Sequence, residues 1–294
     1  MTQHSGPILA ERDGLKIRDC HACGYAHLDP IPGDQTEYYR DVFWSSNGKG
    51  AGWLAIYESQ REWQAMRDGD ILSLIESHTL GRSLLDIGAG YGFFLRAAVS
   101  RNWTQVVGVD PSREASAYAA RALGAHVEPM GWEDVGFPLT TRYDALTAFW
   151  LLEHLPDPLR FLRWAGEHLY GGGALVVAVP QEWTHLQSQA NAVAQIKNYW
   201  VHPTHTSYFS AATLGNLLGR AGLRVVEWLA TFPVETWIIA GHDYTAQPEV
   251  GVKLHREMQA QELAMTREQR LDEMRVRARL AEGRDLIVVA VKSD

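Results

Sequence analysis

Residues 84–95, LLDIGAGYGFFL, decide the fold of this 294-residue chain. An apolar run ends there in Gly88, Gly90 and Gly92, spaced as GxGxG, with Asp86 two residues before the first glycine. Glycine tolerates positive φ and lets the backbone approach a ligand closely, so the stretch predicts a strand, a tight turn and a helix whose N-terminus faces a bound group. The glycines alone leave open a loop that only packs a strand tightly against a helix.

The neighbouring residues narrow the class of ligand. The dinucleotide fingerprint needs its third glycine where this chain has Phe93, which argues against a nicotinamide or flavin dinucleotide. No Lys-Ser or Lys-Thr pair follows to complete a phosphate-binding loop. Asp110 ends the next apolar run, VVGVDPS, at the distance where an acidic residue accepts hydrogen bonds from ribose hydroxyls. The pattern therefore predicts a cofactor that contains an adenosine with free ribose hydroxyls.

From residue 83 onward, short β-branched or leucine-rich runs alternate with amphipathic stretches. This alternation predicts an α/β protein with a mainly parallel sheet covered on both faces. Residues 1–80 mix polar loops with aromatic residues and are interpreted as an N-terminal cap. Residues 231–283 interrupt the alternation before the last run, and two helices plus an apolar loop fit them better than one strand connection. Thr266 and Gln269 there have capping-box spacing.

The glycine stretch, together with VVGVDPS, resembles motif I and the end of the second strand in class I S-adenosylmethionine-dependent methyltransferases. The resemblance continues through YDALTAFWLLEHLPDP, LYGGGALVVAVP and SYFSAATLGNLLGRAGLRVVE, so it covers most of the chain. It implies a Rossmann-like seven-stranded sheet in the order 3-2-1-4-5-7-6 with an antiparallel last strand. The methyltransferase domain is then expected at 81–294, with 231–283 as a helical insertion before the last strand.

The resemblance also assigns the cofactor, S-adenosyl-L-methionine, to particular residues. Asp86 and the three glycines are expected to hold its methionine part, and Asp110 its ribose. The segment MGWEDV stands where an adenine-binding residue lies in the family, and Phe149 ends the predicted fourth strand beside the same site. The cofactor set predicted in full is Asp86, Gly88, Gly90, Gly92, Asp110, Trp132, Glu133 and Phe149.

Ligands of open α/β sheets collect beyond the carboxyl ends of the strands, which leaves the loops after Phe149 and Pro180 for the acceptor. Methyl transfer needs two aligned reactants and, for a hydroxyl acceptor, a base. Candidates in these loops are Glu153, His154, His202, His205 and Tyr208. A local helix-start pair of Glu153 and His154, a solvated loop at 202–208, and a divalent ion held by Glu153 and the histidines all stay open; the metal is not adopted.

Near the N-terminus, Cys20 and Cys23 form one CxxC, half of a structural zinc site, with His21 and His27 nearby. Related enzymes often carry a second pair upstream, which this chain lacks, so zinc and two reduced core cysteines both stay open. The motifs CHACGYAH, HPTHTSYF, TFPVET and GRDLIVVAVK resemble a methyltransferase subgroup linked with polysaccharide or secondary-metabolite biosynthesis.

Composition sets the remaining expectations. The chain has 27 basic and 35 acidic residues, a formal net charge of -8 and no basic stripe, from which nucleic acid is excluded as a partner. No apolar run suggests a membrane partner, and two cysteines without a leader suggest a cytoplasmic protein. The expected function is methyl transfer to a small polar acceptor, a hydroxyl of a sugar or secondary-metabolite intermediate. N- or C-methylation and a non-catalytic cofactor-binding subunit stay open, as does the use of 231–283 as a lid or a homodimer contact.

Overall fold

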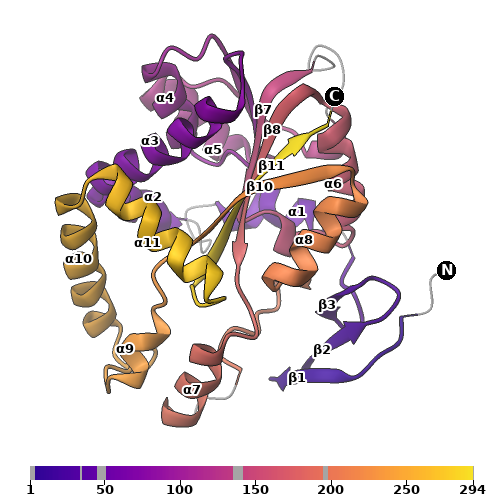
Figure 1. The fold of residues 1–294 in the computed structure, drawn as a ribbon, viewed down its shortest axis with the longest axis vertical. Coiled ribbons are helices and arrows are strands. Elements are labelled where there is room, and N and C mark those ends of the chain that lie inside the picture. The colour runs from indigo at the N-terminus through magenta and orange to yellow at the C-terminus, as the bar shows by residue number, and fades with distance from the viewer. Residues whose placement is uncertain (1–3, 34, 45–50, 135–141, 195–197, 294) are drawn as a thin grey trace.

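Seven of the apolar runs form one sheet in the computed structural model, in the order β6-β5-β4-β7-β8-β11-β10 (Figure 1). Neighbours from β6 to β8 are parallel, whereas β11 is antiparallel to both β8 and β10. Counted along the chain this is the order 3-2-1-4-5-7-6, so the predicted methyltransferase sheet is confirmed. Its strands are β4 (Ser83–Ile87), β5 (Gln105–Val109), β6 (Val127–Glu128), β7 (Tyr143–Phe149), β8 (Leu169–Pro180), β10 (Leu223–Ala230) and β11 (Asp285–Lys292).

The structure describes residues 4–33, 35–44, 51–134, 142–194 and 198–293. Residues 45–50 of the predicted cap, Val135 of MGWEDV and 195–197 of the predicted acceptor stretch lie outside these ranges. The helices before β7 are α1 (Thr36–Tyr38), η1 (Tyr39–Phe43), α2 (Ala51–Ser59), α3 (Arg61–His78), α4 (Phe93–Ser100), α5 (Arg113–Tyr118), η2 (Ala119–Leu123) and η3 (Trp132–Asp134). Those after β7 are η4 (Leu152–His154), α6 (Pro158–Glu167), α7 (His185–Ala194), α8 (Ala211–Arg220), α9 (Glu235–Ile239), α10 (Pro248–Ala264) and α11 (Arg267–Arg279).

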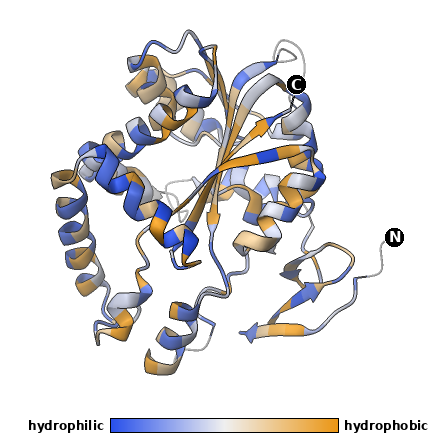
Figure 2. Ribbon diagram, viewed as in Figure 1, coloured by the Kyte–Doolittle hydropathy of each residue, from blue (hydrophilic) through white to orange (hydrophobic). Residues whose placement is uncertain are grey.

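Helices cover both faces of this sheet, which is why its strands are apolar at nearly every position (Figure 2). Consecutive strand residues point to opposite faces, so Leu84 and Leu85 belong to different cores. Leu85 packs in a cluster with Phe161 of α6 and other side chains of α6 and α8. Leu84 packs in a second cluster with Leu72 of α3 and with residues of α4. Helix α3, within the segment interpreted as a cap, thus shares a core with the sheet.

A second sheet lies apart from the main one, at the lower right of Figure 1. Its strands β1 (Ile8–Arg12), β2 (Leu15–Cys20) and β3 (Tyr25–Leu28) are consecutive and antiparallel. The fourth strand, β9 (Ser207–Tyr208), comes much later in the sequence. It pairs with β3 through Ala26↔Tyr208 and His27↔Ser207. The N-terminal segment therefore contributes a small sheet to which the predicted acceptor loop is attached by strand pairing.

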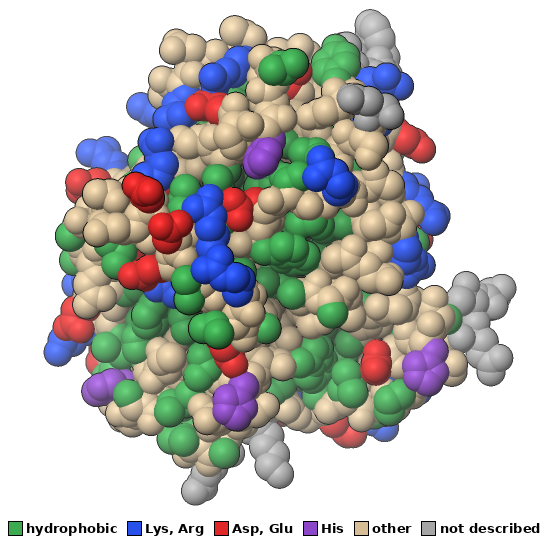
Figure 3. All heavy atoms as spheres, in the orientation of Figure 1, with side chains coloured by type: hydrophobic (Ala, Val, Ile, Leu, Met, Phe, Trp, Pro, Cys, Tyr) green, Lys and Arg blue, Asp and Glu red, His purple; other side chains and the backbone are tan. Residues whose placement is uncertain are grey.

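The stretch before β11 is helical, as predicted. Thr266 and Gln269 form a capping box at the start of α11, each side chain bonding the other's backbone. Arg270 of α11 reaches back to α3, where its Nε and Nη2 donate to the two carboxylate oxygens of Asp70 at 2.6 and 2.9 Å. Figure 3 shows acidic and basic side chains interspersed over the part of this face where α10 and α11 lie.

The close packing around Gly108 of β5 predicts that a larger side chain there destabilises the protein. A methyl group at this position would lie 2.6 Å from Ala89 Cβ and 2.7 Å from Leu95 Cδ1, because the strand packs directly under the glycine loop and α4. Gly108→Ala should therefore lower the free energy of unfolding by about 1–3 kcal/mol in urea titrations, the usual cost of overpacking. Gly219→Ala is the matched control because nothing lies within 4 Å of the added methyl group there. Equal stability of both variants would contradict this packing.

Candidate active site

The GxGxG loop begins where β4 ends and leads into α4. Gly88, Gly90 and Gly92 have φ values of 76°, 50° and 76°, a left-handed conformation that favours glycine. The Gly88 and Ala89 N–H groups donate to the carbonyl of Val109 at the end of β5, at 2.8 and 3.0 Å. The stretch therefore forms a tight turn from a strand into a helix, as predicted from the sequence.

Asp110 fixes this loop from the neighbouring strand. Its Oδ2 accepts a hydrogen bond from the Gly90 N–H and its Oδ1 one from the Ser112 N–H, both at 2.9 Å. Burial raises the pKa of Asp110 to about 6, and the two backbone hydrogen bonds oppose that rise. The carboxylate is thus ionised at neutral pH, and each oxygen keeps lone-pair capacity beyond one backbone bond. The two hydroxyls of a ribose can donate hydrogen bonds to these carboxylate oxygens. The residues therefore fit the adenosine of S-adenosylmethionine.

Asp86 lies one strand away, at the end of β4. Its Oδ1 accepts a hydrogen bond from Thr147 Oγ1 of β7 at 2.6 Å. The side chain is buried, which raises its pKa to about 7. Asp86 therefore ties β4 to β7 beneath the loop, and its predicted contact with the methionine part of the cofactor stays a prediction.

Three further residues, Trp132, Glu133 and Phe149, were predicted to contact the cofactor, and these contacts stay predictions. Trp132 packs edge-to-face on Phe161 of α6, with ring centroids 5.3 Å apart. Trp132 and Glu133 line a hollow of about 440 Å³ together with α6, and the described lining of this hollow contains neither the glycine loop nor Asp110. Phe149 packs on Phe94 of α4 at 4.9 Å, close behind the loop. The structure thus brings Asp110 to the glycines but turns the Trp132 indole toward α6.

The predicted histidines meet beyond the ends of β7 and β8. His154 lies in η4, and its ring centroid is 5.0 Å from that of His205, which in turn lies 5.1 Å from that of His202. His154 Nδ1 lies 2.8 Å from the carbonyl oxygen of Thr204, to which it can only donate, so Nε2 carries the lone pair. The two loops assigned to the acceptor therefore converge on one cluster.

Burial controls the charge of this cluster. It lowers the pKa of His154 to about 4 and that of His205 to about 2, so both imidazoles are neutral at neutral pH. It also raises the pKa of Glu153 well above its ordinary value. Glu153 Oε1 lies 4.0 Å from His154 Nε2. Ligand atoms of Glu153, His154 and His205 lie within 4.8 Å of one another, so the arrangement is also compatible with a cation.

Tyr208 and His202 have local partners as well. The Tyr208 hydroxyl lies 3.1 Å from both the backbone N–H and the carbonyl of His202, and the side chain is buried. His202 Nδ1 lies 2.8 Å from Thr204 Oγ1. These contacts fix the shape of the loop that carries His205. The catalytic contact predicted for Tyr208 stays a prediction, and its hydroxyl is already engaged by the loop.

Two features near the histidines were not predicted from the sequence: Tyr39 and a buried polar group around Arg284. Tyr39 Oη lies 2.8 Å from His154 Nδ1, which places η1 against the histidine cluster. Arg284 Nη1 lies 3.7 Å from Glu235 Oε1, and burial raises the pKa of the neighbouring Glu182 to about 8. Buried polar atoms without a hydrogen-bond partner are places where water or a ligand can bind. Among the described residues they include Glu153 Oε2, Glu182 Oε1, Glu235 Oε2 and Arg284 Nη1.

A signal for two of these residues was present in the sequence. Glu235 lies in TFPVET and Arg284 in GRDLIVVAVK, two motifs singled out for resemblance to the biosynthetic subgroup. Their side chains meet although they are far apart in the chain, because β10 and β11 are adjacent antiparallel strands. The sequence alone does not show this pairing of side chains. The subgroup itself stays a prediction.

Comparison with known proteins now places the chain. A family model described as "Methyltransferase domain" matches residues 57–228, more than half of the sequence. The chain belongs to this methyltransferase domain family. Magnesium protoporphyrin IX methyltransferase from Synechocystis, solved with bound S-adenosylhomocysteine, has the same fold, with a TM-score of 0.53, 13% identity, and coverage of 88% of this chain and 98% of that one. The predicted class I S-adenosylmethionine-dependent methyltransferase is thus confirmed at the level of family and fold.

Relatives similar in sequence include two enzymes named tRNA U34 carboxymethyltransferase. The one from Alteromonas mediterranea is 27% identical over 49% of this chain and 47% of its own length. The one from Cronobacter sakazakii is 31% identical over 64% of this chain and 58% of its own length. This methyltransferase chain spans about half the length of the curated relatives it matches.

These names overturn the exclusion of nucleic acid. The prediction of a partner set without nucleic acid was wrong, because relatives sharing this domain are named for tRNA. Its physical weakness was the use of a whole-chain average: a net charge of -8 says nothing about the potential at one cleft or face. Among the described residues of the methyltransferase, no helix is both long and apolar enough to cross a membrane.

The depressed pKa of His154 predicts a pH dependence of stability. The unfolded chain binds this proton as the pH falls below 6.5, whereas the folded chain resists it until about pH 4, so stability is lost across that window. Between pH 7.5 and pH 5 this single group accounts for about 2 kcal/mol. Urea titrations at both pH values should show a smaller loss in His154→Gln than in the wild type by about that amount. The same pH dependence in both proteins would show that His154 is not held neutral.

Proposed function

We propose that this methyltransferase transfers the methyl group of S-adenosylmethionine to an oxygen of an acceptor bound at the His154–His205 cluster. The observation that carries the proposal is the placement of two chemically distinct sites at one end of a parallel sheet. The glycine loop and Asp110 lie at the ends of β4 and β5, and the histidines follow β7 and β8. Open α/β sheets bind their ligands at this end.

His154 is proposed as the base that accepts the acceptor's proton. The Thr204 carbonyl fixes its Nδ1 tautomer, which leaves the Nε2 lone pair on the side of Glu153. Burial keeps the ring neutral, the form in which it can accept a proton. Glu153 Oε1 lies 4.0 Å from His154 Nε2, and burial favours the neutral form of this carboxyl group. His205 and the polar group around Arg284 are proposed to orient the acceptor.

The cofactor supplies a methyl group on a sulfonium, already activated for in-line displacement. The chain's own contribution is therefore alignment, proton removal and exclusion of water. Trp44 supports the last of these, since its ring lies 3.5 Å from the position of a methyl group at Gly90 and 4.8 Å from the ring of Tyr91. The predicted roles of 231–283 as a lid or a dimer contact remain proposals beside this one.

The acceptor class is open to a direct test. The names of the curated relatives make a tRNA nucleoside the first acceptor to examine, and the sugar or secondary-metabolite hydroxyl expected from the motifs is the second. Incubation with methyl-labelled S-adenosylmethionine and either total tRNA or a panel of sugar and metabolite alcohols separates them by where the label appears. Nucleoside analysis of labelled tRNA then distinguishes a ribose oxygen from a base atom. Label on nitrogen or carbon alone would contradict an oxygen acceptor.

Loss of Asp110 should weaken cofactor binding. Asp110→Ala removes charge-assisted hydrogen bonds to the ribose, which cost about 1.5–3 kcal/mol, or about 10- to 150-fold in affinity. Calorimetry with S-adenosylhomocysteine measures this directly, and NAD should not bind the wild type. Glu114→Gln, an exposed carboxylate four residues away, should bind normally. An unchanged affinity in a folded Asp110→Ala variant would remove the ribose assignment.

Replacing His154 should slow methyl transfer without weakening cofactor binding. His154→Gln is expected to lower kcat by about 10²–10⁴-fold at neutral pH, with partial recovery at higher pH where the acceptor ionises unaided. Its affinity for S-adenosylhomocysteine should match the wild type, because the residue lies on the acceptor side. His185→Gln, an exposed histidine at the start of α7, is the control and should retain full activity. A His154→Gln variant with normal kcat would leave only a positioning role for this cluster.

A further inference from the structure

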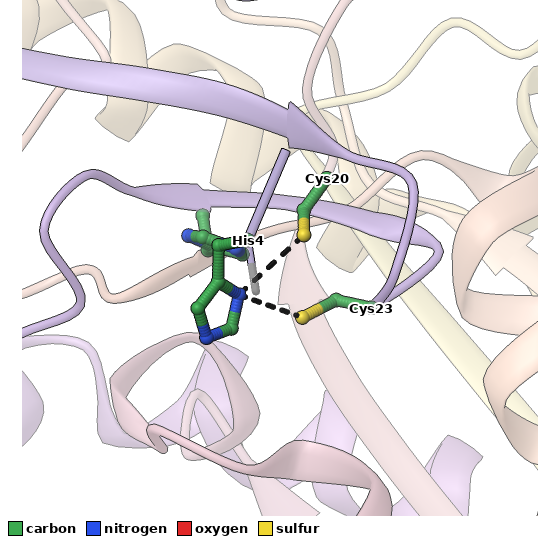
Figure 4. Close-up of side chains that lie close together, drawn as sticks. His4, Cys20 and Cys23 are labelled. Carbon is green, nitrogen blue, oxygen red and sulfur yellow. Dashed lines mark hydrogen bonds between the residues drawn. The ribbon is translucent and has the colours of Figure 1, made fainter. Parts of the chain in front are cut away.

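Four metal-ligating side chains converge in the small N-terminal sheet. Cys20 ends β2, Cys23 lies in the turn to β3, His27 belongs to β3, and His4 comes from the segment that precedes β1. One ligand atom from each of the four lies within 4.8 Å of every other. Figure 4 shows the His4 ring turned toward the sulfurs of both cysteines. The sequence analysis named His21 and His27 beside the cysteines, and the structure brings His4 in place of His21.

The spacing of these atoms matches a tetrahedral zinc site. His4 Nδ1 lies 3.5 Å from Cys20 Sγ and 3.4 Å from Cys23 Sγ. Ordinary Zn–S and Zn–N bonds of about 2.3 and 2.0–2.1 Å place a nitrogen and a sulfur about 3.5 Å apart at two corners of a tetrahedron. Both cysteines are free thiols. The two edges are therefore already close to their length in a metal complex.

His27 supplies a second, independent observation. Its side chain is 1% exposed, and its Nδ1 lies 2.7 Å from the Leu28 carbonyl oxygen, to which it donates. That bond fixes the tautomer and leaves Nε2 as the lone-pair atom. Nε2 is buried and has no hydrogen-bond partner among the described residues. A buried imidazole nitrogen with a fixed lone pair beside the Cys20 thiol is arranged as a metal ligand.

Backbone and side-chain hydrogen bonds hold the turn that carries the two cysteines. The Cys23 backbone N–H hydrogen-bonds the Cys20 sulfur, and the Gly24 N–H donates to the Cys20 carbonyl at 2.8 Å. Gly24 has a φ of 79°, which favours glycine, and Arg220 of α8 donates to the Cys23 carbonyl at 2.6 Å. We propose that His4, Cys20, Cys23 and His27 form a structural zinc site. Four protein ligands close the coordination sphere, so the ion has no open position for catalysis.

The proposed zinc site lies next to the strand that holds the loop carrying His205. His27 pairs in register with Ser207, two residues beyond His205 in the sequence. The Leu28 N–H donates to the Thr206 carbonyl at 2.9 Å, and Ser207 Oγ donates to the Leu155 carbonyl at 3.1 Å. Zinc would thus hold β3 rigid, and β3 holds the loop that carries His205. This inference concerns the support of that loop and does not depend on the identity of the acceptor.

Metal analysis of the untagged full-length chain, purified without chelator, tests the site. We expect one equivalent of zinc per chain. Replacement by Co²⁺ should give the visible bands of tetrahedral cobalt and a thiolate-to-cobalt charge-transfer band. His4→Ala should lower the zinc affinity by at least the 10- to 100-fold that loss of a supporting residue costs. His4 is exposed, so this variant should fold normally. Cys23→Ser should weaken the thiolate-to-cobalt band, because only the Cys20 thiolate remains.

Two controls locate the ion. His21→Ala changes an exposed histidine between the two cysteines and should keep the full equivalent of zinc. His205→Gln should also keep it, which separates this site from the Glu153, His154 and His205 group. A metal that is lost with His205→Gln and kept in His4→Ala would overturn the proposal. So would a Cys20–Cys23 disulfide, or two reduced thiols that do not bind added Zn²⁺.

Hydrogen exchange gives a readout independent of activity. Removing zinc with a chelator should speed amide exchange at residues 25–28 and 206–208, because β3 and β9 share the hydrogen bonds that the ion stabilises. Exchange at 86–92 should stay the same, since the main sheet carries that loop. Unchanged exchange at 206–208 after complete zinc removal would show that the ion does not support the acceptor loop.

Discussion

The two hydrogen bonds that Asp110 accepts from the backbone of Gly90 and Ser112 connect the glycine loop to the end of the neighbouring strand. Three left-handed glycines give this loop few side chains, so its position depends on that neighbour as well as on the packing of Tyr91 against Trp44 and Tyr118. Parallel pairing of β4 with β5, through Asp86↔Gly108, places that neighbour at the adjacent strand end. Burial raises the pKa of Asp110 to about 6, so the carboxylate that organises the loop is ionised in neutral solution.

The acceptor side depends on a different kind of contact. His154 ends the short helix η4, whereas His202 and His205 lie on the loop before β9. Strand pairing to the N-terminal sheet and a hydrogen bond to His154 hold that loop. Tyr39 adds a third segment at His154 Nδ1. The catalytic geometry proposed for this side is therefore assembled from three distant parts of the chain, whereas the cofactor side is built from neighbouring strands.

The difference explains what the sequence could predict. The apolar runs predicted the strands, and the family resemblance implied their order in the sheet. The capping box of Thr266 and Gln269 followed from local spacing alone. The loops carrying His154 and His205 were predicted at one place because parallel strands end together. Each of these inferences uses contacts that are local or repeat regularly.

Contacts between residues far apart in the chain could not be predicted from the sequence. The small sheet was missed because β9 has only two residues and Ile8 and Leu9 of β1 are both exposed, which hides the alternation of a buried strand. His4 meets the cysteines only through the fold of β1 and β2, and Arg284 meets Glu235 only across β10 and β11. The packing of the Trp132 indole on Phe161 and Trp164 of α6 was likewise not predicted, and the contact of Trp132 with adenine stays a prediction. The net charge of the whole chain could not exclude nucleic acid for a similar reason. It averages over all surface charges, whereas only the fold determines which charges gather on one face.

A crystal structure of the complex with S-adenosylhomocysteine tests the central claim that one cleft holds the cofactor at Asp110 and the acceptor at the histidines. The account predicts the ribose hydroxyls within hydrogen-bond distance of the Asp110 carboxylate, the glycine loop against the methionine part, and the sulfur facing His154 with space between them. Cofactor bound in the hollow beside α6, or in contact with His154 and His205 in place of the glycine loop, would contradict it.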